Sequence, residues 1–278
     1  MQAHKGDVGR IAVVGGSLTE HGMIGAPALT ANAALRSGAG LLQIVTPAAA
    51  LPYVALAAPC ATTRVLPGVN ADLAALAVDF GADVVALGPG LGTTVSADQL
   101  LKLLDTFSGG VVIDADGLNV LASAGQWQAR WPHNVVLTPH PGEMRRLLGG
   151  WGLDDDISDR EARTVEYASA TGAVVVLKGA GTVVADPARI YTNQTGNAGM
   201  ATAGAGDVLT GVVAGLLGQR MTAFDAAVLA VYVHGLAGDS GAEQLGRISL
   251  MATDLLDYLP DAFCDLEQEP GGKTDDEP

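Results

Sequence analysis

The sequence predicts an α/β protein: a three-layer α/β/α sandwich with a mostly parallel central sheet. The first observation is that short apolar runs alternate with segments of helical pattern along most of the 278 residues, which is typical of doubly wound sheets. The second is that the runs are continuously apolar, which indicates strands covered on both faces. Aromatic residues make up only 4% of the chain, so Ala, Val, Leu and Gly must form its core.

The expected elements follow from these patterns in chain order. Strands are expected where apolar and β-branched residues run together between turn-forming residues, at 10–16, 40–46, 83–88, 110–115, 134–138, 173–179 and 181–186. Helices are expected where the helical pattern recurs, at 26–37, 71–80, 96–106, 142–148, 158–171, 207–217, 223–241 and 249–258. The last two strands flank a tight turn at 178–181 and are therefore predicted to be antiparallel.

The chain is predicted to form one domain over residues 1–262, because neither an internal repeat nor a linker interrupts the pattern. Residues 263–278 are expected to be a disordered acidic tail, since the stretch ends in Gly, Pro, Asp and Glu. Small residues share one face of the helix after residue 207, and we expect this face to pack tightly against the sheet. They are Gly211, Ala214, Gly215 and Gly218.

Composition excludes several classes of protein. The formal net charge of −15 leaves no basic footprint for nucleic acid. The two cysteines, Cys60 and Cys264, form no CxxC motif, so neither a disulfide framework nor a zinc site is expected. The sequence contains neither a signal peptide nor an apolar stretch of about 18 residues that could span a membrane. A cytoplasmic location is therefore expected.

Unusual residues gather where four predicted strands end. The four segments are "GPGLG" (88–92), "DADGLN" (114–119), "TPHPGE" (138–143) and "KGAG" (178–181). In open α/β sheets, ligands bind beyond the carboxyl ends of the strands. The sequence therefore predicts a site at this edge of the sheet.

The segment "GAGD", Gly204 to Asp207, opens a predicted helix. Its glycines allow close approach of a ligand, and the free N–H groups of a helix start favour an anion. A carboxylate at this rim suits phosphoryl transfer, in which Asp207 would take the proton of the attacking hydroxyl. The alternative is that Asp207 only stabilises the helix start.

Three further features each allow two interpretations. His140 and Glu143 could hold a metal-bound phosphate, or they could simply form a structural turn. Lys178 could neutralise a phosphate, or its charged end could merely reach solvent from a buried strand end. "GPGLG" imitates part of a dinucleotide fingerprint, which leaves an NAD-dependent oxidoreductase as a minor alternative.

Taken together, these motifs resemble the ribokinase-like superfamily and, within it, the bacterial ADP/ATP-dependent NAD(P)H-hydrate dehydratases. The resemblance extends over roughly residues 9–219 and is carried in order by "GRIAVVGGS", "ALGPGLG", "VVIDADGLNVL", "VLTPHPGEMRRLLG", "VVVLKGAGTVV" and "NAGMATAGAGDVLTG". It implies ADP- or ATP-dependent dehydration of NADHX or NADPHX, with Mg²⁺ bridging the phosphates. Phosphorylation converts a poor leaving group, hydroxide, into a good one.

The resemblance also implies roles for individual residues. The hydrated cofactor would be bound by Ala26, Gly90 or Gly92, Asp116, Asn119, His140 and Asp207. The nucleotide would be bound by Lys178, Gly179, Ala180, Gly181, Thr182, Gly204, Ala205 and Gly206. Asp207 would be the catalytic base and Glu143 the metal-binding residue. A homotetramer and a separate NAD(P)HX epimerase are the implied partners.

Two other functions stay open at this point. The first is a ribokinase-like kinase of a small alcohol, such as a sugar or a vitamin precursor. His140 stands where such kinases often carry the Asn of an Asn-x-x-Glu motif, and it therefore favours the dehydratase. The second is a protein that binds nucleotide without turnover. Asp207 argues against it, because binding alone needs no base.

Overall fold

The computed structural model describes residues 8–18, 22–68 and 71–268. One nine-stranded sheet runs through it in the order β3-β2-β1-β4-β5-β6-β7-β8-β9. All neighbouring pairs from β3 to β7 are parallel, and the pairs β7–β8 and β8–β9 are antiparallel. The strands are β1 (Arg10–Val14), β2 (Leu41–Thr46), β3 (Thr62–Val65), β4 (Val84–Leu87), β5 (Gly110–Ile113), β6 (Val135–Leu137), β7 (Val174–Leu177), β8 (Val183–Ala185) and β9 (Ile190–Thr192).

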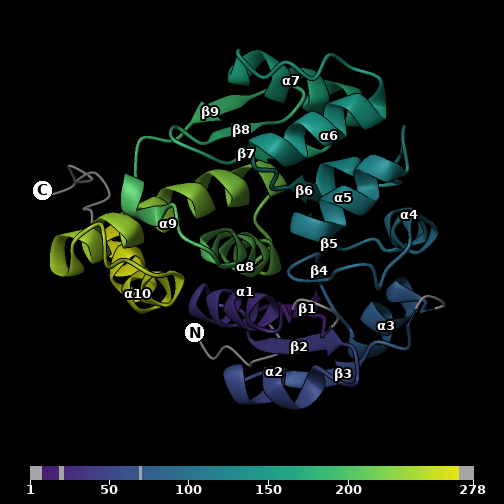
Figure 1. Cartoon of the computed structure of the whole chain (residues 1–278), viewed down its shortest axis with the longest axis horizontal. Coiled ribbons are helices and arrows are strands. Elements are labelled where there is room, and N and C mark those ends of the chain that lie inside the picture. Colours follow the sequence, from purple (N-terminus) through teal and green to yellow (C-terminus); the bar gives the residue numbers. More distant parts are fainter. Residues whose placement is uncertain (1–7, 19–21, 69–70, 269–278) are drawn as a thin grey trace, which may run out of the picture.

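Helices cover both faces of the sheet (Figure 1). One layer contains α1 (Gly25–Arg36), α2 (Leu51–Ala57), α8 (Ala205–Gly218), α9 (Ala223–Leu245) and α10 (Ala252–Gln268). The other contains α3 (Leu73–Phe80), α4 (Ala97–Thr106), α5 (Ala115–Ser123), α6 (Pro141–Trp151) and α7 (Arg160–Thr171). Each layer encloses its own buried apolar cluster against the sheet. The predicted three-layer α/β/α fold is confirmed.

The seven predicted strands and eight predicted helices are all present, but the sequence patterns missed two strands and two α-helices of the described chain. Strand β3, with the sequence TTRV, and strand β9, with IYT, lie at the two edges of the sheet and are partly exposed. Edge strands carry polar residues and short runs, so neither has the continuous apolar pattern. Helix α2 has only seven residues, and α5 begins within an Asp-Gly segment that looks like a turn.

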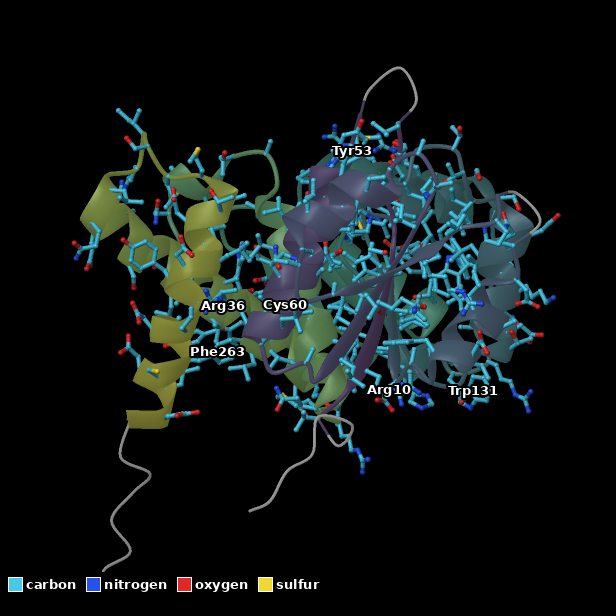
Figure 2. All side chains as sticks on the ribbon, turned by 90° about the horizontal axis from the view of Figure 1, so that it is seen from below. Arg10, Arg36, Tyr53, Cys60, Trp131 and Phe263 are labelled. Carbon is cyan, nitrogen blue, oxygen red and sulfur yellow. The ribbon has the colours of Figure 1, made fainter. Side chains whose placement is uncertain are left out.

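Figure 2 separates the amino ends of the parallel strands from their carboxyl ends. Arg10, the first residue of β1, and Trp131, which precedes β6, lie low in that view, whereas Tyr53 in α2, which follows β2, lies high. The carboxyl ends of the parallel strands are therefore at the top of the view. All four unusual segments of the sequence leave the sheet there.

The expected packing of the α8 small-residue face against the sheet is wrong for Gly211 and Gly215. A methyl group on Gly211 would lie 2.2 Å from the carbonyl oxygen of Thr30, and one on Gly215 would lie 2.9 Å from that of Ala34. Both carbonyls belong to α1, so these glycines let two helices of one layer approach each other. Gly218, at the end of the face, lies near Ile11 of β1.

The predicted start of the acidic tail also needs correction. Residues 263–268 continue helix α10, whose apolar side packs on the α1–α8 layer, and residues 269–278 lie outside the described residues. A length of helix was missed because its acidic residues, such as Asp265, face solvent while Phe263 and Leu266 pack inward. No helix in the described part of the chain has both the length and the apolar character needed to cross a bilayer.

Candidate active site

The strand order reverses between β1 and β4, since β1 continues to β2 on one side and β4 to β5 on the other. Such a switch point opens a crevice beyond the carboxyl ends of the strands. Gly90, after β4, approaches Ala26 at the start of α1 so closely that a methyl group on Gly90 would lie 3.2 Å from the Ala26 side chain. The structure thus brings these two predicted substrate-binding residues together at the crevice.

Asp116 anchors the loop that follows β4. Its carboxylate accepts a hydrogen bond from the backbone N–H of Gly92 at 2.7 Å. Asn119, one turn further along α5, lies 3.5 Å from the other oxygen of Asp116 and accepts from Arg146 of α6 at 2.8 Å. These predicted pocket residues therefore connect the loop after β4 to helices α5 and α6 beside the crevice.

The "GAGD" segment begins helix α8, as predicted. Gly204 has a φ of 92° and is the N-cap of the helix, a conformation that side chains rarely adopt. Two side chains from other helices bind backbone carbonyl oxygens of the first turn. Nε2 of His234 donates to the carbonyl of Ala205 at 3.0 Å, and the Thr30 hydroxyl lies 3.0 Å from the backbone carbonyl oxygen of Asp207. The first turn is therefore held rigidly, with its leading N–H groups available to an anion.

Burial lowers the pKa of His234 to about 4, so the imidazole is neutral at physiological pH. A neutral imidazole whose Nε2 carries the proton is the form that donates to a carbonyl oxygen. His234 therefore holds the helix start without adding charge to the site.

Asp207 lies in the first turn of α8 and is partly buried. Burial, together with the negative charge of Asp114, raises the pKa of Asp207 to about 7. The ammonium of Lys178 opposes this shift, and the carboxylates of Asp116 and Glu143 add to it. A carboxylate with a pKa near neutrality is suited to accept a proton from a hydroxyl.

Lys178 follows β7, and its ammonium is held by carboxylates from two other strand exits. Its Nζ lies 2.6 Å from Oδ1 of Asp114, which follows β5, and 3.9 Å from Oε2 of Glu143 in α6. Burial alone would lower the pKa of Lys178, but the two carboxylates outweigh it and raise the pKa above its ordinary value. The predicted nucleotide-binding lysine is therefore a fixed positive charge.

The "KGAGT" segment, 178–182, forms a tight loop between β7 and β8. The Thr182 hydroxyl donates to the carbonyl of Gly179 at 2.9 Å. Arg160, the first residue of α7, donates to the carbonyls of Leu177 at 2.9 Å and Lys178 at 3.2 Å, and also to that of Ala180. With these carbonyls directed to Arg160, the loop has a defined shape on which a nucleotide could be bound.

His140 and Glu143 form a capping box at the start of α6. The His140 ring nitrogen Nδ1 accepts from the N–H groups of Gly142 and Glu143, and Glu143 Oε2 accepts from the His140 N–H at 2.7 Å. Burial raises the pKa of Glu143. The geometry favours the structural interpretation of Glu143 over direct metal ligation, while half of the His140 side chain remains exposed.

The structure adds three residues to the site for which the sequence predicted no role: Arg160, His234 and Thr210, whose hydroxyl donates to Asp114 at 2.8 Å. None had a signal of its own, because each lies within a helix and reaches the site only through the fold. Asp114 opens the predicted segment 114–119, but the sequence assigned it no individual role.

Comparison with known proteins shows the family of this chain. The family model described as NAD(P)H-hydrate dehydratase matches residues 11–261. The bifunctional NAD(P)H-hydrate repair enzyme Nnr of Moorella thermoacetica is 44% identical over 275 residues, covering 96% of this chain and 51% of that protein. The ADP-dependent (S)-NAD(P)H-hydrate dehydratase of Neisseria meningitidis is 40% identical over 250 residues, covering 88% and 81%. The chain thus spans about half the length of the bifunctional relatives it matches.

Solved structures give the same result. The ADP/ATP-dependent NAD(P)H-hydrate dehydratase of Bacillus subtilis, co-crystallized with ATP/Mg²⁺, has a TM-score of 0.78 at 30% identity and covers 95% of this chain and 92% of that one. Hydroxyethylthiazole kinase of Pyrococcus horikoshii has a TM-score of 0.61 at 17% identity, which shows the shared fold alone. The matched model and these relatives lead to one conclusion: the chain belongs to the NAD(P)H-hydrate dehydratase family, within the ribokinase-like fold.

Proposed function

We propose that this protein uses ADP or ATP to dehydrate the S form of NADHX or NADPHX to NADH or NADPH, releasing phosphate and AMP or ADP. The observation that carries the proposal is Asp207, a carboxylate with a pKa of about 7 in the first turn of α8, beside free backbone amides. Family membership supplies the substrate class. A base next to an anion-binding helix start supplies the chemistry.

The proposed reaction has two steps. In the first, the ring hydroxyl of the hydrated cofactor attacks the terminal phosphoryl group of the nucleotide, Asp207 accepts the hydroxyl proton, and the bond to AMP or ADP breaks. In the second, the C–O bond of the phosphorylated ring breaks, phosphate leaves with the bonding electrons, and loss of a ring proton restores the double bond. The amides of the α8 start and the Lys178 ammonium oppose the negative charge that moves with the phosphoryl group.

Mg²⁺ accompanies the nucleotide in this proposal. Among residues 8–18, 22–68 and 71–268, no group of three or more His, Cys, Asp or Glu side chains could hold a metal ion. Two carboxylates whose charges act on Asp207 are already engaged. Asp114 binds Lys178 and Thr210, and Glu143 binds the backbone N–H of His140. The residues present do not fit a protein-held Mg²⁺, so we assign Mg²⁺ to the nucleotide phosphates and water, its common mode of binding.

Incubation with purified NADHX and ADP or ATP tests the proposal. Recovery of the absorbance of the reduced nicotinamide, with one AMP or ADP released per NADH formed, is the expected result. A phosphorylated small alcohol without recovery of NADH would instead identify a kinase. A shift in melting temperature with nucleotide, but no product from any acceptor, would identify a binding protein without turnover.

The pH dependence of kcat/KM provides a second test. Since Asp207 must be ionised to accept a proton and its pKa is about 7, kcat/KM should fall by about tenfold per pH unit below pH 7 and level off above it. Stopped-flow rates between pH 5 and pH 8.5 measure this. A profile that is flat across this range would contradict the role of Asp207 as base.

The proposal extends to a homotetramer, a separate NAD(P)HX epimerase as functional partner and a cytoplasmic location. The first two rest on resemblance to the family, and the third on the sequence pattern described above. Light scattering on the eluting protein would test the first, and the requirement for added epimerase with R-NADHX would test the second.

A further inference from the structure

Asp114 is a buried carboxylate for which the proposed reaction has no direct use. Its side chain is 2% exposed, and although it is the N-cap residue of α5, it makes no capping hydrogen bond. Its Oδ1 lies 2.6 Å from Lys178 Nζ, and its Oδ2 accepts from the Thr210 hydroxyl at 2.8 Å. Burying a charged pair is costly unless the remaining oxygens are also bonded, and here both oxygens are.

The two partners of Asp114 belong to the two glycine-containing segments of the site, the loop at 178–182 and the helix that "GAGD" begins. Lys178 opens the loop between β7 and β8, and Thr210 lies in α8 one turn after Gly206. The Thr210 hydroxyl is also 3.0 Å from the Gly206 carbonyl, but its single proton favours the charged acceptor. Asp114 therefore connects the proposed nucleotide loop to the proposed anion-binding turn.

Lys178 is directed at that turn. A methyl group on Gly206 would come within 3.2 Å of the ammonium Nζ and 3.9 Å of Asp114 Oδ2. The ammonium thus lies between two carboxylates, those of Asp114 and Glu143, and the backbone of the first turn of α8. In this position it would act on an anion bound at the turn.

We propose that Asp114 is a positioning residue, which holds the Lys178 ammonium at the start of α8 as a fixed positive charge for the migrating phosphoryl group. Asp114 and Glu143 then serve this ammonium and do not bind a metal ion directly. The inference rests on the proposed function for its kinetic test. The physical reason is preorganisation: a charge fixed before the reaction stabilises the transition state without reorienting during it.

The first test is a double-mutant cycle. Asp114→Asn keeps the shape and the Thr210 hydrogen bond but removes the charge that holds the ammonium. It should lower kcat about 10²-fold and change the KM for ADP by less than about threefold, because a loss confined to the transition state lowers kcat alone. Lys178→Met should lower kcat at least as much. The double variant should be no slower than Lys178→Met alone, since Asp114 acts through Lys178.

The matched control is Asp79→Asn, which removes a carboxylate from an exposed ion pair with Arg64 and should leave kcat unchanged. Losses that multiply in the double variant would overturn the proposal, because a merely structural Asp114 would act independently of Lys178. An Asp114→Asn enzyme with wild-type kcat would overturn it as well.

A second test needs no turnover and therefore separates this inference from the proposed function. We expect wild-type protein without nucleotide to show no saturable binding of Mn²⁺, used as a probe for Mg²⁺, below about 1 mM by electron paramagnetic resonance. Saturable Mn²⁺ binding that Asp114→Asn abolishes would show that the carboxylate holds a metal, and the proposal would fail. If wild-type protein binds ADP but does not convert NADHX, the proposed function fails, and this titration still decides the role of Asp114.

Discussion

Replacing Asp207 with asparagine is expected to lower turnover by about 10²–10⁴-fold, the usual contribution of a general base, and to leave nucleotide binding intact. The amide has the shape of the carboxyl group but cannot accept the proton. Asp207 contacts α1 through its backbone, since its carbonyl oxygen lies 3.0 Å from the Thr30 hydroxyl. The substitution leaves this contact in place, so the helix start should keep its form. Single-turnover release of AMP measures the first effect, and calorimetric titration with ADP measures the second.

The same variant should be more stable than the wild type at neutral pH. The pKa of Asp207 is about 7 in the folded protein against 3.8 for the free group, so folding is penalised once the unfolded chain ionises. This penalty is absent below about pH 4, grows as the pH rises and levels off above about pH 7. The advantage of Asp207→Asn in melting temperature should follow that course.

For the turnover prediction, an Asp207→Asn variant that retained more than about a tenth of the wild-type rate would show that Asp207 is not the base.

The second large effect concerns stability. A methyl group at Gly211 would lie 2.2 Å from the Thr30 carbonyl oxygen and 2.6 Å from the Ala33 side chain. Backbone cannot move aside as a flexible side chain does, so α1 and α8 would have to separate. We expect Gly211→Ala to destabilise the protein by about 3 kcal/mol, and its melting temperature to fall by about 6 °C or more. Calorimetric melting curves measure the change.

Gly149→Ala is the matched control for this prediction. Gly149 also lies in a helix, α6, but a methyl group there would meet no atom within 4 Å. Replacing a helical glycine at an open position should stabilise the protein by about 0.5–1 kcal/mol. If Gly211→Ala melted within about 1 °C of the wild type, tight α1–α8 packing would be wrong. Because α1 also carries Ala26 and Thr30, the Gly211 variant should lose activity as well.

Part of the site could be predicted from the sequence because it depends on local backbone. The segments 88–92, 114–119, 138–143 and 178–181 each follow a run of apolar residues, and the carboxyl ends of parallel strands meet at one edge. Asp207 was identifiable in the same way, since glycines before a helix start and a carboxylate within it form a local pattern.

The interpretation of individual side chains was less secure. His140 and Glu143 were open to two interpretations, a metal-bound phosphate site or a structural turn, and in the structure they form a capping box. The spacing i, i+3 is common to both roles, so spacing alone could not separate them. The sequence also left open which element packs on the face of Gly211 and Gly215. A stripe of small residues shows that something approaches closely, but it does not identify the element.

The sequence by itself determined the layered α/β fold and predicted both the strand ends that carry the proposed site and the carboxylate proposed to act there, because strand periodicity, glycine conformation and helix starts are local properties. Only the tertiary structure decided which charges meet. Asp114, Lys178 and Thr210 come from segments up to 96 residues apart, and the Asp207 pKa depends on the burial of Asp207 and on the nearby charges of Asp114 and Lys178. Electrostatic interaction is a function of distance in space, and distance in space between remote segments exists only once the chain has folded.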